Sequence, residues 1–130
     1  MECTFRTAGR VMTTLTVASH RHDPFLVMKL TGELQHATAE DAEAEILAAI
    51  AMQTGPPHLV LDLTGVGFLD AGGIDLLARA RTAVRAHNGT LRLVATPHGR
   101  PRYVLRLTSL DEAIPVSDTL THALTTLDSA

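Results

Sequence analysis

Residues 58–64 (HLVLDLT) limit the possible folds more than any other part of this sequence. Apolar residues stand there at alternating and adjacent positions, which is the pattern of a strand that is covered on both faces. Strands of this kind belong to parallel sheets, in which helices pack on either side. We therefore predict that this segment is the central strand of an α/β domain.

The segments around this strand alternate between the period of a strand and that of a helix. Residues 11–18 and 25–31 are short runs of β-branched and large apolar residues, typical of strands. Apolar residues recur at helical spacing in residues 39–50 and again in residues 74–84. Thr38 can cap the first of these helices, with Asp41 three residues later in a weak capping box.

The C-terminal part continues the same alternation. Asn88-Gly89 tolerates a left-handed backbone and predicts the end of the second helix before a strand at residues 90–96. A third helix is expected from Pro101 to about Thr108, because proline suits a first helical turn. A short strand at residues 114–117 and a helix at residues 118–127 complete the chain.

The resulting order is strand, strand, helix, strand, helix, strand, helix, strand, helix. This order favours a central, mostly parallel sheet that is flanked by helices and joined by right-handed crossovers. A chain of 130 residues has room for one hydrophobic core. We expect a single domain at residues 11–130, preceded by a flexible tail at residues 1–10.

Composition excludes several classes of function. A net charge of −3 and an aromatic content of 3% argue against nucleic-acid binding. No apolar run approaches the roughly 20 residues that span a bilayer, so we expect a cytoplasmic protein without membrane insertion. Arginines concentrate in the second half of the chain, where they form a solvated face or meet an acidic partner.

The stretch from Gly65 to Gly73 (GVGFLDAGG) joins the central strand to the second helix, and we expect a loop at residues 65–69. Ligands collect at such junctions, and a helix N-terminus favours an anion. Gly65 and Gly67 begin a nucleotide-binding pattern, but Asp70 stands where its third glycine belongs and would repel a pyrophosphate. The other interpretation is that Asp70 caps the helix while the glycines permit close packing.

Several motifs in this order resemble the STAS family of bacterial anti-sigma factor antagonists. The resemblance covers roughly residues 11–127. It rests on these segments: LTGEL at residues 30–34, TAE at 38–40, LVLDL at 59–63, FLDAGG at 68–73, GTLRLV at 89–94, VLRL at 104–107 and IPV at 114–116.

The resemblance implies the STAS fold and a non-enzymatic role as a protein-binding module. Such antagonists bind an anti-sigma factor, often a kinase with an ATP-binding fold, and thereby release a sigma factor for transcription. The family's usual switch is a phosphorylated Ser or Thr directly after the Asp of a D-[ST]-[ST]-G motif. This chain keeps Asp70 and Gly73 but has Ala71 and Gly72 between them, so neither position can be phosphorylated.

A second departure lies at Gln35, where many family members have an acidic residue. The resemblance implies a partner-binding surface formed by Glu33, Gln35, Asp70, Ala71, Gly72 and Gly73. We interpret the chain as an antagonist without a phosphoacceptor, either permanently able to bind or regulated through its partner. The alternatives are a STAS module of a stress-signalling scaffold or of a transport-associated complex and, less favoured, a nucleotide-binding protein.

Other chemistry has little support in the sequence. The seven histidines are scattered, and Cys3 is the only thiol, so we expect neither a metal site nor a cofactor. The chain has no motif of a serine hydrolase or a zinc protease. We interpret Asp62 as a strand-end or packing carboxylate rather than as a catalytic acid.

Overall fold

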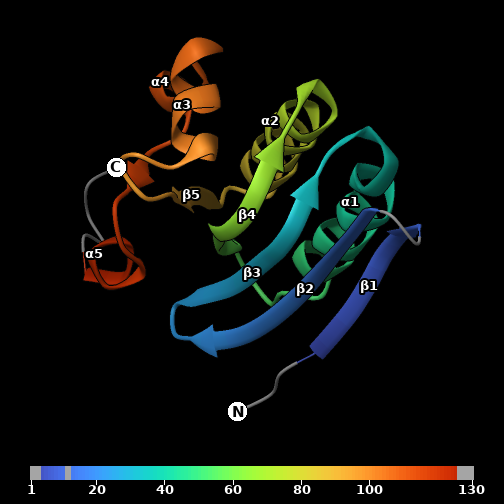
Figure 1. The fold of residues 1–130 in the computed structure, drawn as a ribbon. Coiled ribbons are helices and arrows are strands. Elements are labelled where there is room, and N and C mark those ends of the chain that lie inside the picture. The colour runs from blue at the N-terminus through green and yellow to red at the C-terminus, as the bar shows by residue number, and fades with distance from the viewer. Residues whose placement is uncertain (1–3, 11–12, 126–130) are drawn as a thin grey trace.

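A computed structural model describes residues 4–10 and 13–125. It contains one sheet with helices packed against it (Figure 1). The strands are β1 (Thr4–Arg10), β2 (Thr13–His22), β3 (Phe25–Leu34), β4 (His58–Leu69), β5 (Thr90–Val94) and β6 (Val116–Ser117). The helices are α1 (His36–Ala51), α2 (Ala71–Ala86), α3 (Arg100–Leu107), α4 (Leu110–Ala113) and α5 (Leu120–Thr125).

The six strands lie in the sheet in their sequence order. β1, β2 and β3 form an antiparallel meander, whereas β3, β4, β5 and β6 are parallel neighbours. Parallel neighbours need crossover connections, which here contain the helices between those strands. The predicted α/β class, with a mostly parallel centre and flanking helices, is confirmed.

The N-terminal segment differs from the prediction. A flexible tail at residues 1–10 is wrong for Thr4–Arg10, which form β1 and pair with β2 along the register from Thr4↔Ser19 to Arg10↔Thr13. The sequence TFRTAGR has no apolar run that would announce a strand. Pairing with the edge of β2 supplies the hydrogen bonds that define it. Val11, where we expected the next strand to begin, lies outside the described residues.

Two differences concern the other elements. The expected loop at residues 65–69 is wrong, because β4 runs on to Leu69 and keeps β3 as its partner, through Glu33↔Phe68 and Leu34↔Leu69. The short helix α4 was not expected, and the predicted end of the last helix at Leu127 lies outside the described residues.

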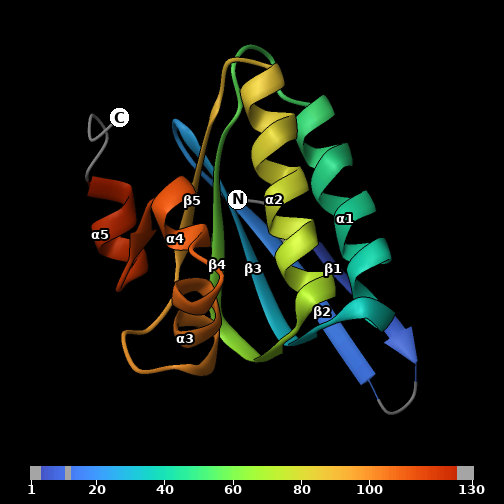
Figure 2. The same ribbon diagram turned by 90° about the horizontal axis from the view of Figure 1, so that it is seen from above.

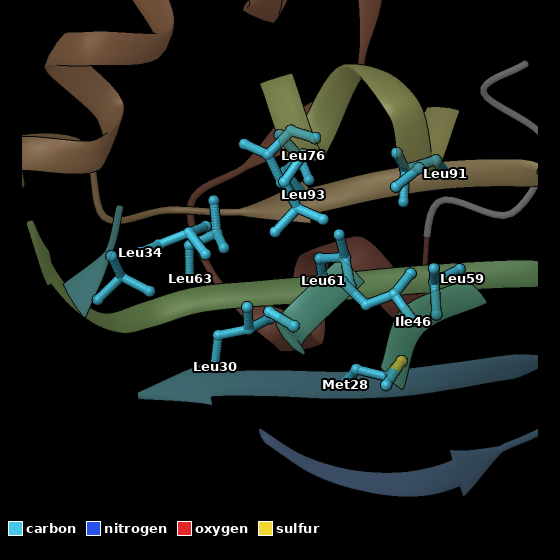
Figure 3. Packing of buried hydrophobic residues seen from close by; sticks show 14 of the residues in the cluster. Met28, Leu30, Leu34, Ile46, Leu59, Leu61, Leu63, Leu76, Leu91 and Leu93 are labelled. Atoms are coloured by element: carbon cyan, nitrogen blue, oxygen red, sulfur yellow. The ribbon is translucent and has the colours of Figure 1, made fainter. Parts of the chain in front are cut away.

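One hydrophobic core lies between the sheet and helices α1 and α2. Leu59, Leu61 and Leu63 alternate along β4 toward this face, and side chains from β3, β5 and both helices surround them (Figure 3). Figure 2 shows α1 and α2 side by side on this face of the sheet. Burial on this face explains the apolar pattern of the central strand.

A smaller apolar cluster covers the opposite face of the sheet. Val27, Val60 and Val94 come from three neighbouring strands, and Ala123 of α5 packs against them. Phe25 completes this cluster beneath Arg92, whose guanidinium lies 5.3 Å from the ring centroid and donates to the carbonyl of Ala123. The short helix α5 is therefore held to the sheet by both apolar and polar contacts.

We predict that Leu61→Ala lowers the free energy of unfolding by about 2–5 kcal/mol, because Leu61 is fully buried and its loss leaves a cavity. Leu107→Ala is the matched control, since Leu107 is 66% exposed, and should change stability by less than about 0.5 kcal/mol. Urea denaturation of both variants measures the difference. Equal destabilisation by the two substitutions would contradict this description of the core.

Candidate functional site

The junction between β3, β4, α1 and α2 lies at the carboxyl end of the parallel strands. β3 ends at Leu34 and β4 ends at its register partner Leu69. The N–H of Asp70 then donates to the carbonyl of Leu34 across 3.3 Å. Because α1 and α2 begin directly after these two strands, their N-termini are neighbours (Figure 2).

The carboxylate of Asp70 connects the two helix starts. Its Oδ1 accepts a hydrogen bond from the N–H of Gly73 at 3.2 Å, within the first turn of α2. Its Oδ2 accepts from the N–H of His36 at 3.3 Å, at the first residue of α1. The predicted cap of α2 is confirmed. One side chain thus satisfies an unpaired N–H group at the start of each helix.

The start of α1 differs from the prediction. Gln35, not Thr38, is the N-cap residue, and Thr38 occupies the third helical position and is fully buried. The hydroxyl of Thr38 accepts from the N–H of Gln35 at 3.2 Å and donates to the carbonyl of Glu33 at 2.7 Å. The threonine therefore fixes the turn between β3 and α1, as the third residue of a capping box does.

The structure brings the six residues of the predicted partner-binding surface to this one junction. Ala71 and Glu33 are exposed, whereas Gln35 is half-buried and donates through Nε2 to Oε1 of Glu33 at 3.4 Å. The half-buried carboxylate of Asp70 is occupied by the two helix starts. Of the six residues, Ala71 and Glu33 are therefore the exposed ones.

Gly72 and Gly73 allow the two helices to start so close together. A Cβ at Gly73 would lie 2.6 Å from the carbonyl oxygen of Leu34, and one at Gly72 would lie 2.7 Å from Cα of His36. Both distances are shorter than real Cβ contacts. Any side chain at Gly72, serine and threonine included, would therefore require α1 to move.

Phe68 is a site residue that sequence reasoning missed. It is 38% exposed, and it pairs in register with Glu33 on the neighbouring strand. Once residues 65–69 are known to be a strand, alternation places Phe68 on the opposite side from buried Leu69. The signal in the sequence is a large apolar residue two positions before a helix cap, next to Leu69, which the core buries.

The structure contradicts the nucleotide-binding interpretation, because the residues expected to form its phosphate loop belong to a strand. Gly65 and Gly67 lie within β4, and a Cβ at Gly65 would meet Thr31 and Leu30 of β3. Three cavities in the described part of the chain lie elsewhere, at α2 and β5, at the start of α3, and beside Phe25. A phosphate loop at this glycine pair is therefore excluded by the strand pairing.

Asp62 has a local structural role. It is buried, and its Oδ1 accepts from the N–H of Thr64 at 3.0 Å and from the hydroxyl of Thr64 at 2.7 Å. These bonds lie where the pairing of β3 with β4 shifts register. Asp62 does not lie at a strand end, because β4 continues to Leu69, whereas its burial and these two bonds agree with the interpretation as a packing carboxylate.

No group of three or more His, Cys, Asp or Glu side chains in residues 4–10 and 13–125 could hold a metal ion. Over the same residues, none of the helices has both the length and the apolar character needed to cross a membrane.

Comparisons with known proteins agree with the fold. The sequence profile described as STAS domain matches residues 16–123. A crystal structure of an anti-sigma factor antagonist from Mycobacterium paratuberculosis is 34% identical, with a TM-score of 0.76, and the alignment covers 85% of this chain and 92% of that one.

Two further relatives extend the comparison. A protein of Paenibacillus polymyxa named anti-sigma F factor antagonist is 26% identical over 116 residues, which cover 88% of this chain and 96% of that protein. A STAS domain protein from Planctomyces limnophilus has the same fold at 23% identity and a TM-score of 0.69, over 83% of this chain and 93% of its own.

We predict that Asp70→Ala lowers the free energy of unfolding by about 1–2 kcal/mol, because two helix starts lose a hydrogen-bond acceptor. Asp75→Ala removes the same group from an exposed position on α2 and should cost less than about 0.5 kcal/mol. Chemical denaturation compares the two. If the control is equally destabilised, the bridging role assigned to Asp70 is wrong.

A second prediction concerns the close approach at Gly73. Gly73→Ala should destabilise the fold by about 1–3 kcal/mol, although alanine is the better helix former, because its Cβ would meet the Leu34 carbonyl. Gly67→Ala is the matched control, since nothing lies within 4 Å of a Cβ there. Thermal unfolding of both variants gives the answer. An unchanged melting temperature for Gly73→Ala would show that the junction can relax.

Proposed function

Since the chain belongs to the STAS domain family, we propose that it is a non-enzymatic protein-binding module that acts as an anti-sigma factor antagonist. It binds an anti-sigma factor and thereby releases a sigma factor for transcription. Two relatives that align over most of their own length carry this name, and one of them is 34% identical. Because sigma factors act with RNA polymerase, we place the protein in the cytoplasm.

The observation that carries this proposal is the exposed junction at the start of α2. Ala71, Glu33 and Phe68 are exposed there, although α1 and α2 pack closely beside them. Of these side chains, the exposed aromatic ring of Phe68 is of the kind that is enriched at protein interfaces. The hydrogen bonds of Asp70 and Thr38 hold this surface in one conformation before a partner arrives. A preformed surface reduces the entropy cost of association.

The chain lacks the family's phosphorylation switch at this surface. Ala71 is exposed at the position of the usual phosphoacceptor, so the surface stays in its unphosphorylated form. Phosphorylation would add about −1.5 to −2 charges and disrupt an interface by repulsion and desolvation. Without it, we propose that binding is controlled by the amount or the modification of the partner, which sets occupancy by mass action.

We predict that a negative charge at Ala71 weakens binding to the anti-sigma factor. Ala71→Glu should raise the Kd at least about tenfold, since it places an unpaired carboxylate in the interface. A glutamate in the first turn favours the helix, so the variant should remain folded. Ala78→Glu is the matched control, because Ala78 is exposed on the same helix two turns away. It should keep the wild-type Kd within about twofold.

Calorimetric titration with each purified anti-sigma factor of the source organism measures these constants. Binding that neither substitution weakens would place the interface elsewhere on the chain. If none of the anti-sigma factors binds the wild type, and a transporter subunit or a stress-signalling scaffold does, the antagonist function is wrong.

We further predict that the chain cannot be switched by phosphorylation because residue 71 has no hydroxyl group. The wild-type protein should not be phosphorylated at the start of α2 by a cognate anti-sigma kinase with ATP, whereas Ala71→Ser should be. Mass spectrometry of peptides that contain residues 68–85 distinguishes the two. Thr82 is the one hydroxyl residue of this range in the wild type, and its phosphorylation would contradict the proposal by showing a switch at another position of α2. An unmodified Ala71→Ser protein would show that kinase recognition has also been lost.

A further inference from the structure

A cavity of about 330 Å³ lies at the other end of α2, against the outer edge of β5 and the segment that joins α4 to β6. Its inner wall is apolar, because Val84, Leu91 and Ile114 are buried there and Pro115 lies beside them. The volume is at the lower end of the range for small-molecule sites, which is roughly 300–1,000 Å³. It therefore suits a small ligand with an apolar body.

Two arginines of α2 line the same cavity, and no acidic side chain does. Arg81 donates through Nε to the carbonyl of Ala113 at 3.1 Å, which ties α2 to the end of α4. The side chain of Arg85 is exposed, and among the described residues its guanidinium forms no ion pair or hydrogen bond. Its planar guanidinium is thus available to an anion, and a carboxylate matches its two parallel donors.

The third polar feature is the backbone of Leu91. Along β5, the N–H of Thr90 donates to Pro57 on the β4 side, whereas that of Leu93 donates to Pro115 on the β6 side. Because this direction alternates along a strand, the N–H of Leu91 points to the β6 side. β6 pairs only with Leu93 and Val94. Leu91 therefore directs an N–H without a strand partner toward the cavity.

The carboxyl end of a helix normally repels an anion. Here the last carbonyls of α2 already have donors. The N–H of Gly89 donates to Val84 at 2.7 Å, and the N–H of Asn88 donates to Arg85 at 3.0 Å. Nδ1 of His87 lies 2.9 Å from the carbonyl of Ala83. These bonds reduce the partial negative charge at the carboxyl end of the helix beside the cavity.

We propose that this cavity binds a small organic carboxylate with an apolar body. The body packs against Val84, Leu91 and Ile114, and the carboxylate pairs with Arg85 and accepts from the N–H of Leu91. Such a ligand would join α2, β5 and the α4–β6 segment. Arg81, Val84 and Arg85 in the C-terminal half of α2 line the cavity, whereas the Asp70 junction lies at the start of this helix, so the site is separate from the proposed partner surface.

The test uses the full chain and 4-phenylbutyrate as the probe, with its neutral amide as the chemical control. In ¹H–¹⁵N spectra we expect saturable shifts of the Leu91, Ala113 and Ile114 amides. The neutral amide should bind at least about fivefold more weakly, because it cannot form the charge-assisted bonds. Absence of saturable shifts up to about 10 mM probe would overturn the proposal.

Variants distinguish binding of the probe in this cavity from a general attraction of its carboxylate to positive charge on the protein. Arg85→Gln should raise the Kd at least about fivefold. Lys29→Gln removes the same charge from an exposed position on β3 and should leave the Kd within about twofold. Ala113→Leu should block the cavity without a change of charge. Equal weakening by Arg85→Gln and Lys29→Gln, in variants with wild-type melting temperatures, would mean non-specific binding only and would refute the site.

Discussion

The junction of the two helix starts depends on the hydrogen bonds that the carboxylate of Asp70 accepts. Two strands end side by side, and two helices begin there with unpaired N–H groups that lie close together. Donors of this kind cost free energy when they lack acceptors. Asp70 accepts from both helix starts, so the spacing of α1 and α2 is fixed by one side chain. Gly72 and Gly73 leave the room that this arrangement needs.

The elements that could be predicted from the sequence are those whose apolar residues recur at a regular spacing and are buried. β4 was predictable because Leu59, Leu61 and Leu63 face the main core while Val60 faces the second cluster. β1 was not predictable, since it is held by the ladder to β2, and such pairing leaves no signature in TFRTAGR. Residues 65–69 were misassigned for the same reason, because glycines indicate a loop until a partner strand supplies hydrogen bonds.

The position of the candidate site could be predicted from the sequence, but the contacts between its residues could not. The cap by Asp70 follows from local rules, whereas its second bond, to His36, joins residues 34 positions apart. The role of Thr38 was assigned to the wrong helical position because capping residues occur at both ends of a capping box. Phe68 became recognisable only when the strand was extended. Contacts across the junction come from tertiary structure, and no local pattern encodes them.

Steric constraints also bear on the proposed loss of regulation by phosphorylation. A return to the family motif would need hydroxyl residues at both Ala71 and Gly72, but the two positions are not equivalent. Ala71 is exposed and can accept a longer side chain, whereas a Cβ at Gly72 would approach the backbone of His36 to 2.7 Å. In this chain, the close approach of the start of α1 to Gly72 therefore restricts the second position. On the proposed function, Ala71 alone decides whether this surface can be switched by phosphorylation.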